Sequence, residues 1–460
     1  MLSGRAAPAG PVSHPPAPPR DARWAAEWVL PVLDPPIRAG AVAVEAGRIV
    51  AVGGRDAVAR THAHLPESDL GGAVLAPGLI DAHCHLEWAL LGGLLPSAPF
   101  HRWLAAMISH RGRTRSDGAL DVAARLGALR CLQHGTTTVA DSGPTGAGVP
   151  AAAELGLRAH VLLEVVGRDR GADAVRRADE VADALDALRQ LAGPLVRVGT
   201  APHAIYSVGP ELWEALLAHD TLRGGPWGCH LAESPAEREL VASGGGALAL
   251  LFASAGFEPA LWPGPPGDTP VVRADRAGVL RDGLLAAHCV QLDAGDAALL
   301  GERGVRPVLC PTSNAHLVCG VAPLGAFRRA GVRPALGTDS PASAGPFDLR
   351  AEARMLAATQ GLAGDPLTPD ELLRMATMDG AGALDRGDIG ALAVGRRADL
   401  TAVVPPLESE GPPAAGFLHP LGRVVAVAVD GEARIWDGRL LGADAEAITT
   451  AAADARRRLC

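Results

Sequence analysis

The sequence predicts an α/β protein built on a (β/α)8 TIM barrel, to which the N- and C-terminal segments add a small β-sandwich. Three observations lead to this fold class. Eight short apolar runs alternate with helical patterns through the middle of the 460-residue chain, which is typical of a parallel barrel. Both ends of the chain carry β-type runs with turn signals. Nearly every apolar run in the middle ends at a polar or ionisable residue, as strands do at the mouth of such a barrel.

The two ends of the chain differ in character from its middle. Residues 1–23 are rich in proline and alanine, and we expect them to form a disordered tail. Residues 24–75 contain short β-type runs with a hairpin signal at Ala46-Gly47, and residues 394–445 have the same character. We therefore expect these two segments to form the sandwich together. Residues 446–460 are expected to form a C-terminal helix.

Residues 76–393 carry the barrel pattern. Helical segments separate several of the apolar runs, for example over 173–192, where apolar residues recur at helical spacing. A second helix is expected over 117–134, closed by Gly135. The eight runs are, in order, VLAPGLIDAH, TTTVAD, RAHVLLE, VRVGTAPH, PWGCHLA, GLLAAH, RPVLC and RPALGTD.

The composition limits the classes of partner. The net charge is −9 and charged residues make up 20% of the chain, whereas nucleic acids and anionic membranes attract a basic face. We therefore expect a small-molecule substrate, with no nucleic acid and no membrane as a partner. No apolar stretch reaches the roughly 18 residues of a membrane span, and the N-terminus lacks the features of a secretory signal. The sequence thus predicts a cytoplasmic protein whose seven cysteines are reduced.

All 42 basic residues are arginine, because the sequence contains no lysine. A genome rich in G and C explains this bias without any functional reason. The bias nevertheless excludes metal sites in which a carboxylated lysine bridges two ions. Any metal site in this chain must use His, Asp, Glu or Cys.

Residues that can carry chemistry stand at or just after the ends of the apolar runs. A single histidine at a strand end is usually a hydrogen-bonded loop residue, so the prediction rests on the joint pattern. The carboxyl ends of barrel strands converge on one mouth, where active sites of this fold lie. The residues in question are Asp81, His83, His85, Asp141, Glu164, His203, His230, Glu233, His288, Ser313, Asn314 and Asp339.

Four of these residues form a plausible metal-binding set. His83 and His85 are two apart, so on a strand their imidazoles point to the same side. Two such histidines alone are more often solvated loop residues. Together with His230 and Asp339 they supply three nitrogen donors and one carboxylate, which suits a zinc-like or ferrous ion with an open position for water.

Glu233 is the best candidate for proton transfer. A metal ion lowers the pKa of bound water, and a neighbouring carboxylate can take the proton and pass it to a leaving group. Asp339 could serve both as a ligand and as a second base. We expect His288 to hold the attacking water or the polarised oxygen. A surface acid or a helix-capping residue is the structural alternative for Glu233.

The sequence resembles the amidohydrolase superfamily. The motifs that carry the resemblance are PGLIDAHCH, GTTTVAD, APHAIYS, HLAE, AHCV, CPTSN and GTDS, in this order, and it extends from Val44 to Leu400. The most similar branch contains S-adenosylhomocysteine deaminases, aminodeoxyfutalosine deaminases and triazine chlorohydrolases. The resemblance implies one divalent metal ion per chain, zinc or alternatively iron, and a homodimer, for which the sequence has no specific feature. It assigns metal binding to His83, His85, His230 and Asp339, catalysis to Glu233, His288 and Asp339, and substrate contact to His203, Ser313 and Asn314.

The substrate predicted from these residues is a purine nucleoside, attacked at its amino-bearing carbon by a metal-activated water. Glu87 could hold a ribose diol, while Trp88 and Trp103 could stack on a purine, although packing is the simpler role for each tryptophan. Arginines within 101–115 and 168–170 could clamp a carboxylate. Aminodeoxyfutalosine or another adenosine derivative would satisfy these hints.

Two alternatives remain open at the level of sequence. A guanine- or cytosine-type free-base deaminase, or a triazine-type chlorohydrolase, would use the same metal site, and Glu87 is the residue that separates them from a nucleoside deaminase. A catalytically inactive barrel that acts as a binding protein is the more remote alternative, since such proteins usually lose metal ligands and every one is present here.

Overall fold

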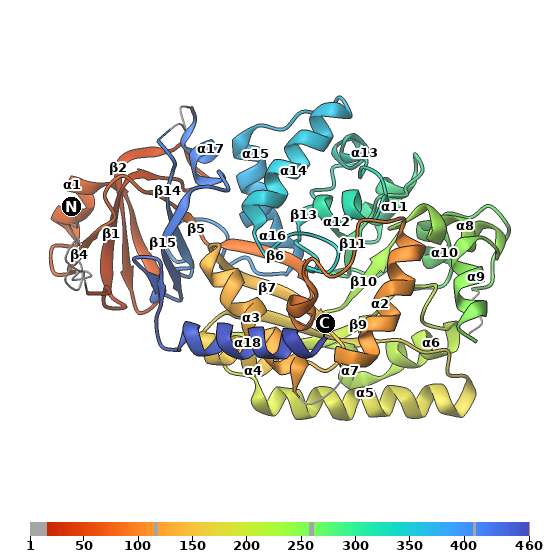
Figure 1. Ribbon diagram of the computed structural model, residues 1–460. Coiled ribbons are helices and arrows are strands. Elements are labelled where there is room, and N and C mark those ends of the chain that lie inside the picture. Colours follow the sequence, from red (N-terminus) through yellow and green to blue (C-terminus); the bar gives the residue numbers. More distant parts are fainter. Residues whose placement is uncertain (1–15, 115–117, 257–261, 408–410, 460) are drawn as a thin grey trace, which may run out of the picture.

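The computed structural model describes residues 16–114, 118–256, 262–407 and 411–459 (Figure 1). Residues 1–15, which make up most of the expected N-terminal tail, lie outside the described part. Among the described helices, none is both long enough and apolar enough to cross a membrane.

Eight parallel strands form the centre of the larger part of the molecule. They belong to two four-stranded sheets in which the strands follow one another in sequence order. Isolated bridges, one between Cys84 and Asp339 and one between Thr200 and Trp227, link the two sheets. This is a TIM-barrel-type α/β fold, and each of the eight apolar runs supplies a strand. The first sheet contains β6 (Leu79–Cys84), β7 (Thr136–Gly143), β8 (Arg158–Val165) and β9 (Val196–Pro202); the second contains β10 (Gly228–Leu231), β11 (Leu285–His288), β12 (Arg306–Leu309) and β13 (Ala335–Leu336).

Helices surround these strands (Figure 1). α5 covers Gly171–Leu191 and buries residues spaced three or four apart, such as Ala178, Val181 and Leu185, as a helix that packs on a sheet requires. The other helices of this part are η1 (Leu86–Leu91), α2 (Phe100–Thr114), α3 (Ala119–Gln133), α4 (Gly148–Leu155), α6 (Pro210–Ala218), α7 (Asp220–Arg223), α8 (Pro235–Ser243), α9 (Ala247–Ser254), α10 (Pro270–Arg276), α11 (Asp296–Glu302), α12 (Pro311–His316), α13 (Leu324–Arg329), α14 (Leu349–Leu362), α15 (Pro369–Arg374), η2 (Met375–Asp379) and α16 (Gly380–Ala383).

The two ends of the chain meet in one nine-stranded mixed sheet beside the parallel strands (Figure 1). β14 from the C-terminal segment runs antiparallel to β5 from the N-terminal segment, and β5 runs parallel to β1. The strands are hydrogen-bonded in a single sheet, so the two layers of a sandwich stay a prediction. The sheet contains β1 (Ala22–Val29), β2 (Ile37–Glu45), β3 (Arg48–Gly54), β4 (Glu67–Asp69), β5 (Val74–Pro77), β14 (Leu400–Val404), β15 (Arg423–Val429), β16 (Glu432–Trp436) and β17 (Arg439–Leu440), with α1 (Arg55–Thr61) and α17 (Pro413–Phe417) beside it.

A buried ion-pair network ties this sheet to the parallel strands. Arg158, the first residue of β8, donates two hydrogen bonds to Asp399, at 2.9 and 3.0 Å, and a third to Asp430, at 2.8 Å. The C-terminal helix α18 (Ala445–Leu459) returns along α3 (Figure 1), where Arg456 donates to the carbonyl of Gly92 at 2.7 Å. Both contacts join segments that are far apart in the sequence.

Apolar side chains fill the space that the two parallel sheets enclose. Seven of the eight strands contribute inward-facing residues, and α16 and its neighbours complete the cluster from one end. We call this cluster the central apolar layer. Its members are Ile80, Ala82, Ala140, Leu162, Ala201, Leu285, Val308, Ala335, Ala381, Ala383, Leu384 and Ile389.

Candidate metal centre

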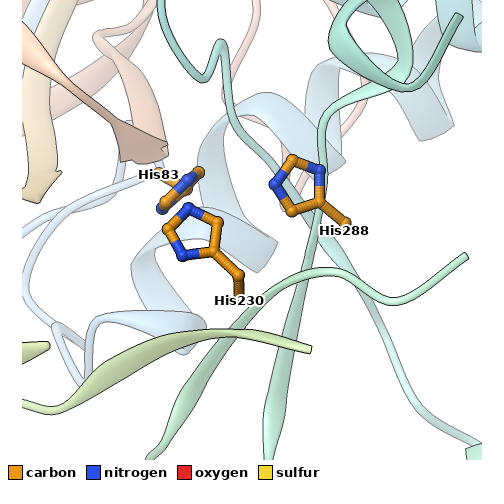
Figure 2. A group of neighbouring side chains, drawn as sticks. All are labelled: His83, His230 and His288. Carbon is orange, nitrogen blue, oxygen red and sulfur yellow. The ribbon is translucent and has the colours of Figure 1, made fainter. Parts of the chain in front are cut away.

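The predicted metal-binding residues come together at the carboxyl ends of the parallel strands. His83 lies in β6 and His85 follows it, His230 lies in β10, and Asp339 follows β13. His288, the last residue of β11, joins them. Figure 2 shows the rings of His83, His230 and His288 around one space; the ring of His83 lies 4.9 Å from that of His230 and 5.8 Å from that of His288.

Two overlapping sets of ligand atoms are close enough to share an ion. His83, His85 and Asp339 form one set and His83, His230 and His288 the other, with the ligand atoms of each set within 4.8 Å of one another. Nε2 of His85 lies 3.3 Å from Nε2 of His230 and 3.3 Å from Oδ1 of Asp339. The four predicted ligands therefore lie around one point, and His288 is a further donor that the sequence did not assign to the metal.

The hydrogen bonds of two histidines fix which nitrogen faces the centre. Nδ1 of His85 donates to the carbonyl of Ser142 at 2.7 Å, and Nδ1 of His230 donates to the carbonyl of His203 at 3.0 Å. Because a carbonyl only accepts, the neutral rings must carry their lone pairs on Nε2. Two lone pairs then face each other across 3.3 Å, which requires a cation or a proton between them.

The remaining ligands fit a cation as well. Nε2 of His83 is buried and has no hydrogen-bond partner among the described residues. Oδ2 of Asp339 accepts from Ser313 at 2.5 Å and from Ser343 at 2.7 Å, which leaves Oδ1 towards the histidines. Burial alone would raise the pKa of Asp339, but the neighbouring histidines hold it well below its ordinary value. The set of three imidazoles and one ionised carboxylate fits one divalent metal ion.

Protonation of His85 is the metal-free counterpart of this site. Burial by itself would lower the pKa of His85, but the hydrogen bond and charge of Asp339 raise it to about 9. A proton on Nε2 of His85, held by Asp339, would thus stand where a metal ion would bind. Metal binding must release this proton, since the metal takes the Nε2 lone pair.

Glu233 lies beside the metal ligands in a dry environment. It is 3% exposed, and burial, followed by the charges of Asp339 and Glu237, raises its pKa well above the ordinary value. Its Oε1 lies 3.8 Å from Nε2 of His288. Glu237 accepts hydrogen bonds from the backbone of Ala232 and Glu233, at 3.1 and 2.6 Å, and so fixes the turn that presents Glu233. The sequence did not assign this positioning role to Glu237.

The backbone at the strand ends is strained. Ala232, His288, Cys289 and Asp339 all have positive φ angles, of 51°, 74°, 47° and 57°. Residues other than glycine adopt this region at a cost of roughly 1–3 kcal/mol each, and such residues cluster at functional sites. The strain therefore agrees with the assignment of this end of the strands as the active site.

A narrow cavity of about 80 Å³ opens above the metal-binding residues. Its polar lining includes His85, Glu164, His203, His230, Glu233, His288 and Asp339. The opposite wall is apolar and comes mainly from α2, whose spacing puts every third or fourth residue on one face. From the sequence, only Trp88 and Trp103 were suggested for this wall, as residues that could stack on a purine. The other residues were not assigned, although the periodicity of α2 carries the signal for them. The apolar lining consists of Trp88, Phe100, Trp103, Leu104, Met107, Ile108, Tyr206 and Leu317.

The predicted substrate-binding residues divide into two groups. Trp88 and His203 line the cavity. Ser313 and Asn314 do not, because Ser313 binds Asp339 and Asn314 accepts a hydrogen bond from Nδ1 of His288 at 2.9 Å. Both therefore position site residues, and their contact with the substrate stays a prediction.

The predicted ribose contact of Glu87 stays a prediction, and its carboxylate has several partners within the protein. Its carboxylate is 1% exposed and accepts hydrogen bonds from the backbone of Thr145, Gly146 and Ala147, at 3.2, 2.9 and 3.2 Å, and from the Thr145 hydroxyl at 2.8 Å. With these partners it secures the loop after β7 and does not line the cavity. The arginines expected to clamp a carboxylate do not line the cavity either, where they fall within the described side chains.

Comparison with known proteins agrees with this geometry. The model of the amidohydrolase family matches residues 74–434. A 5-methylthioadenosine/S-adenosylhomocysteine deaminase of Syntrophobacter fumaroxidans is 33% identical over 426 residues, which cover 89% of this chain and 90% of that protein.

Two solved structures have the same architecture. An adenosine deaminase from Xanthomonas campestris with bound zinc superposes with a TM-score of 0.79 at 29% identity, covering 96% of this chain and 99% of that one. The aminofutalosine deaminase of Helicobacter pylori, in complex with methylthio-coformycin, gives a TM-score of 0.77 at 20% identity, covering 90% of this chain and 100% of that one. At this lower identity the second match supports the fold alone.

Proposed function

The chain belongs to the amidohydrolase family, and on this premise we propose that it is a zinc-dependent deaminase of adenosine derivatives with an uncharged 5′ substituent. The observation that carries the proposal is the convergence of His83, His85, His230 and Asp339 beside the buried Glu233. Three nitrogen donors and one carboxylate suit zinc. The bound zinc of the Xanthomonas campestris relative supports the same choice.

The chain's own residues can perform the proton transfers of deamination. When bound, the metal ion would lower the pKa of a water molecule, so that this water can lose a proton and attack at neutral pH. Nδ1 of His288 is held by Asn314, so its Nε2 lone pair faces Glu233 and can orient the attacking water. The charge of a bound metal ion would offset the burial of Glu233 and favour its ionised form. Ionised Glu233 takes the proton of this water and delivers it to the purine ring nitrogen beside the reacting carbon. Glu233, ionised again, takes the second proton of the former water from the hydroxyl on that carbon and passes it to the amino nitrogen. The bond from the carbon to the amino nitrogen then breaks, and ammonia leaves.

The lining of the cavity supports an uncharged substituent on the substrate. Its ionisable groups are histidines and the carboxylates of Glu164, Glu233 and Asp339, with no arginine among the described lining residues. A carboxylate on the substrate would lie close to these acidic groups and would have no arginine to pair with. The apolar wall from α2 instead suits a group such as a methylthio substituent. The walls must move apart on binding, because small-molecule sites usually enclose about 300–1,000 Å³.

Ammonia release from a set of matched substrates tests the proposal. Purified protein loaded with zinc is given 5′-methylthioadenosine, S-adenosylhomocysteine, adenosine and adenine, with Glu233→Gln as the inactive control. We expect the highest kcat/KM for 5′-methylthioadenosine, a lower value for the charged S-adenosylhomocysteine, and the lowest for adenine. Preference for adenine would assign a free-base deaminase. Preference for S-adenosylhomocysteine would contradict the uncharged-substituent assignment, and no turnover of any of them would contradict the proposed reaction.

A further inference from the structure

One strand connects two different cavities. On β8, residues two apart face the same side, so His160, Leu162 and Glu164 all point between the sheets. Glu164 lines the cavity at the metal centre, and Leu162 belongs to the central apolar layer. His160 lines a second cavity at the opposite end of the strands, with a volume of about 590 Å³. We call it the basal cavity, and the central apolar layer separates it from the metal centre.

His160 is an unsatisfied polar group in this cavity. It is 2% exposed, and neither ring nitrogen has a hydrogen-bond partner among the described residues. Burial and then the charges of Arg197, Arg386 and Arg158 lower its pKa to about 3, so the ring is neutral and offers one N–H donor and one lone pair. Buried polar groups normally have a partner, so this ring indicates one that the chain itself does not supply.

The arginines around the cavity outnumber the carboxylates available to them. Arg189, Arg197 and Arg281 line it, and only Arg189 has an acidic partner, Asp186, at 2.5 Å. The Arg281 guanidinium lies over the Trp227 ring at 5.0 Å and donates a hydrogen bond to the carbonyl of Arg223 at 3.3 Å, but it has no acidic partner among the described residues. Arg197 is exposed to solvent where it lines the cavity, and its side chain makes no ion pair or hydrogen bond with the described residues.

Acidic residues at the rim do not cancel this charge. Asp282 also lines the cavity, and its carboxylate pairs with Arg306 at 3.4 Å. Asp385 is exposed at the rim. The cavity thus has two guanidinium groups without an acidic partner among the described residues, those of Arg197 and Arg281. Only one carboxylate at its rim, that of Asp385, has no basic partner among them.

We propose that the basal cavity binds a phosphate-bearing small molecule, with Arg197 and Arg281 as the cationic groups and His160 as the neutral donor. Guanidinium groups recognise phosphate oxygens through paired, charge-assisted hydrogen bonds. The cavity volume lies within the range of small-molecule sites and exceeds what one phosphate ion fills. This site is separate from the metal centre and from the deaminase reaction.

Calorimetric titration of the full chain with inorganic phosphate, ribose 5-phosphate and ribose tests the site. We expect both phosphates to bind, the sugar phosphate more tightly, and ribose not to bind. Arg197→Gln should weaken phosphate binding by about 10- to 150-fold. Arg38→Gln serves as the matched control, because Arg38 is an exposed arginine on β2 far from the cavity, and it should bind like the wild type. Tighter binding of inorganic phosphate would overturn the assignment of a larger ligand.

A second readout reports on His160 directly. In protein labelled at histidine, phosphate should shift the His160 imidazole resonances and raise its pKa, because a bound anion offsets the neighbouring arginine charges. Deaminase activity of Arg197→Gln should equal that of the wild type, which confirms that the variant folds. Equal phosphate binding by wild type and Arg197→Gln, or an unmoved His160 resonance at saturating phosphate, would overturn the proposal.

Discussion

Replacing Glu87 distinguishes between two roles for this residue, namely securing the loop after β7 and binding the substrate. In Glu87→Gln the side chain keeps its shape and one carbonyl oxygen, so the amides of Gly146 and Ala147 keep an acceptor. What is lost is the negative charge and the acceptor for the Thr145 hydroxyl. Hydrogen bonds to a charged group contribute about 1.5–3 kcal/mol each, against about 0.5–1.5 kcal/mol for neutral ones. We therefore expect a loss of about 1–3 kcal/mol of unfolding free energy.

Glu87→Ala should lower the unfolding free energy more than Glu87→Gln does. It leaves the backbone amides of Thr145 and Gly146 and the Thr145 hydroxyl without an acceptor, whereas the Ala147 amide keeps Oγ1 of Thr145 at 3.3 Å. Each unsatisfied buried group costs about 1–3 kcal/mol. Water entering the space will recover part of this, so we expect about 3–6 kcal/mol. Gly143→Ala should resemble the milder variant, because an added Cβ would lie 2.3 Å from Oε1 of Glu87 and displace the carboxylate.

Urea denaturation and steady-state kinetics on a nucleoside and its free base check this reasoning together. Glu27→Gln, at a half-exposed glutamate on β1, is the control for a lost surface charge. We expect Glu87→Gln to lower the unfolding free energy while the ratio of kcat/KM for nucleoside and base stays unchanged. A rise of 5- to 150-fold in the KM for the nucleoside alone, with normal stability, would refute the loop role and restore the ribose contact.

Three further perturbations test the site and the basal cavity. Glu233→Gln should keep the metal, measured by elemental analysis, and lower kcat by about 10²–10⁴-fold; near-normal kcat would assign the base to another group. His230→Ala should lose both the ion and the activity, while the wild type should hold one ion per chain; two tightly held ions would contradict the mononuclear site. His160 has its pKa lowered to about 3 in the folded state, so only the unfolded chain binds its proton as the pH falls from 6.5 towards 3. In phosphate-free buffer the unfolding free energy of the wild type should therefore fall by about 1.3 kcal/mol more than that of His160→Gln between pH 7 and pH 5.5; parallel pH profiles of the two proteins would contradict this.

The residues at the metal centre were predictable because two simple rules act together. Strand alternation puts His83 and His85 on one side, and parallel strands bring their carboxyl ends to one place. Neither rule depends on which side chains surround a residue. The same rules could not assign His288 to the metal, because its distance from His83 and His230 depends on the positive φ angles at the end of β11.

Contacts made by neighbouring loops could not be predicted in this way. Glu87 and Trp88 are adjacent in a 3₁₀ helix, where successive side chains point about a third of a turn apart. Trp88 faces the cavity and Glu87 therefore faces the loop after β7. Because Glu87 follows His85 closely in the sequence, we predicted that it contacts the substrate. The direction of each side chain around the 3₁₀ helix, however, determines which of Glu87 and Trp88 faces the cavity.

The strand pattern also contains information about the end of the fold that lies opposite the active site. On β8 the inward-facing positions are His160, Leu162 and Glu164, and on β9 they include Arg197 and Ala201. β8 thus places polar residues at both ends of its inward-facing row and an apolar residue between them, and β9 begins its row with a polar residue. Catalysis does not explain a polar residue at the amino end of an inward-facing row, because the active site of this fold lies at the carboxyl ends of the strands. When several strands bring arginine or histidine to that end, the pattern indicates either a structural ion-pair network or a second ligand. The buried His160 ring, with no partner among the described residues, favours the ligand.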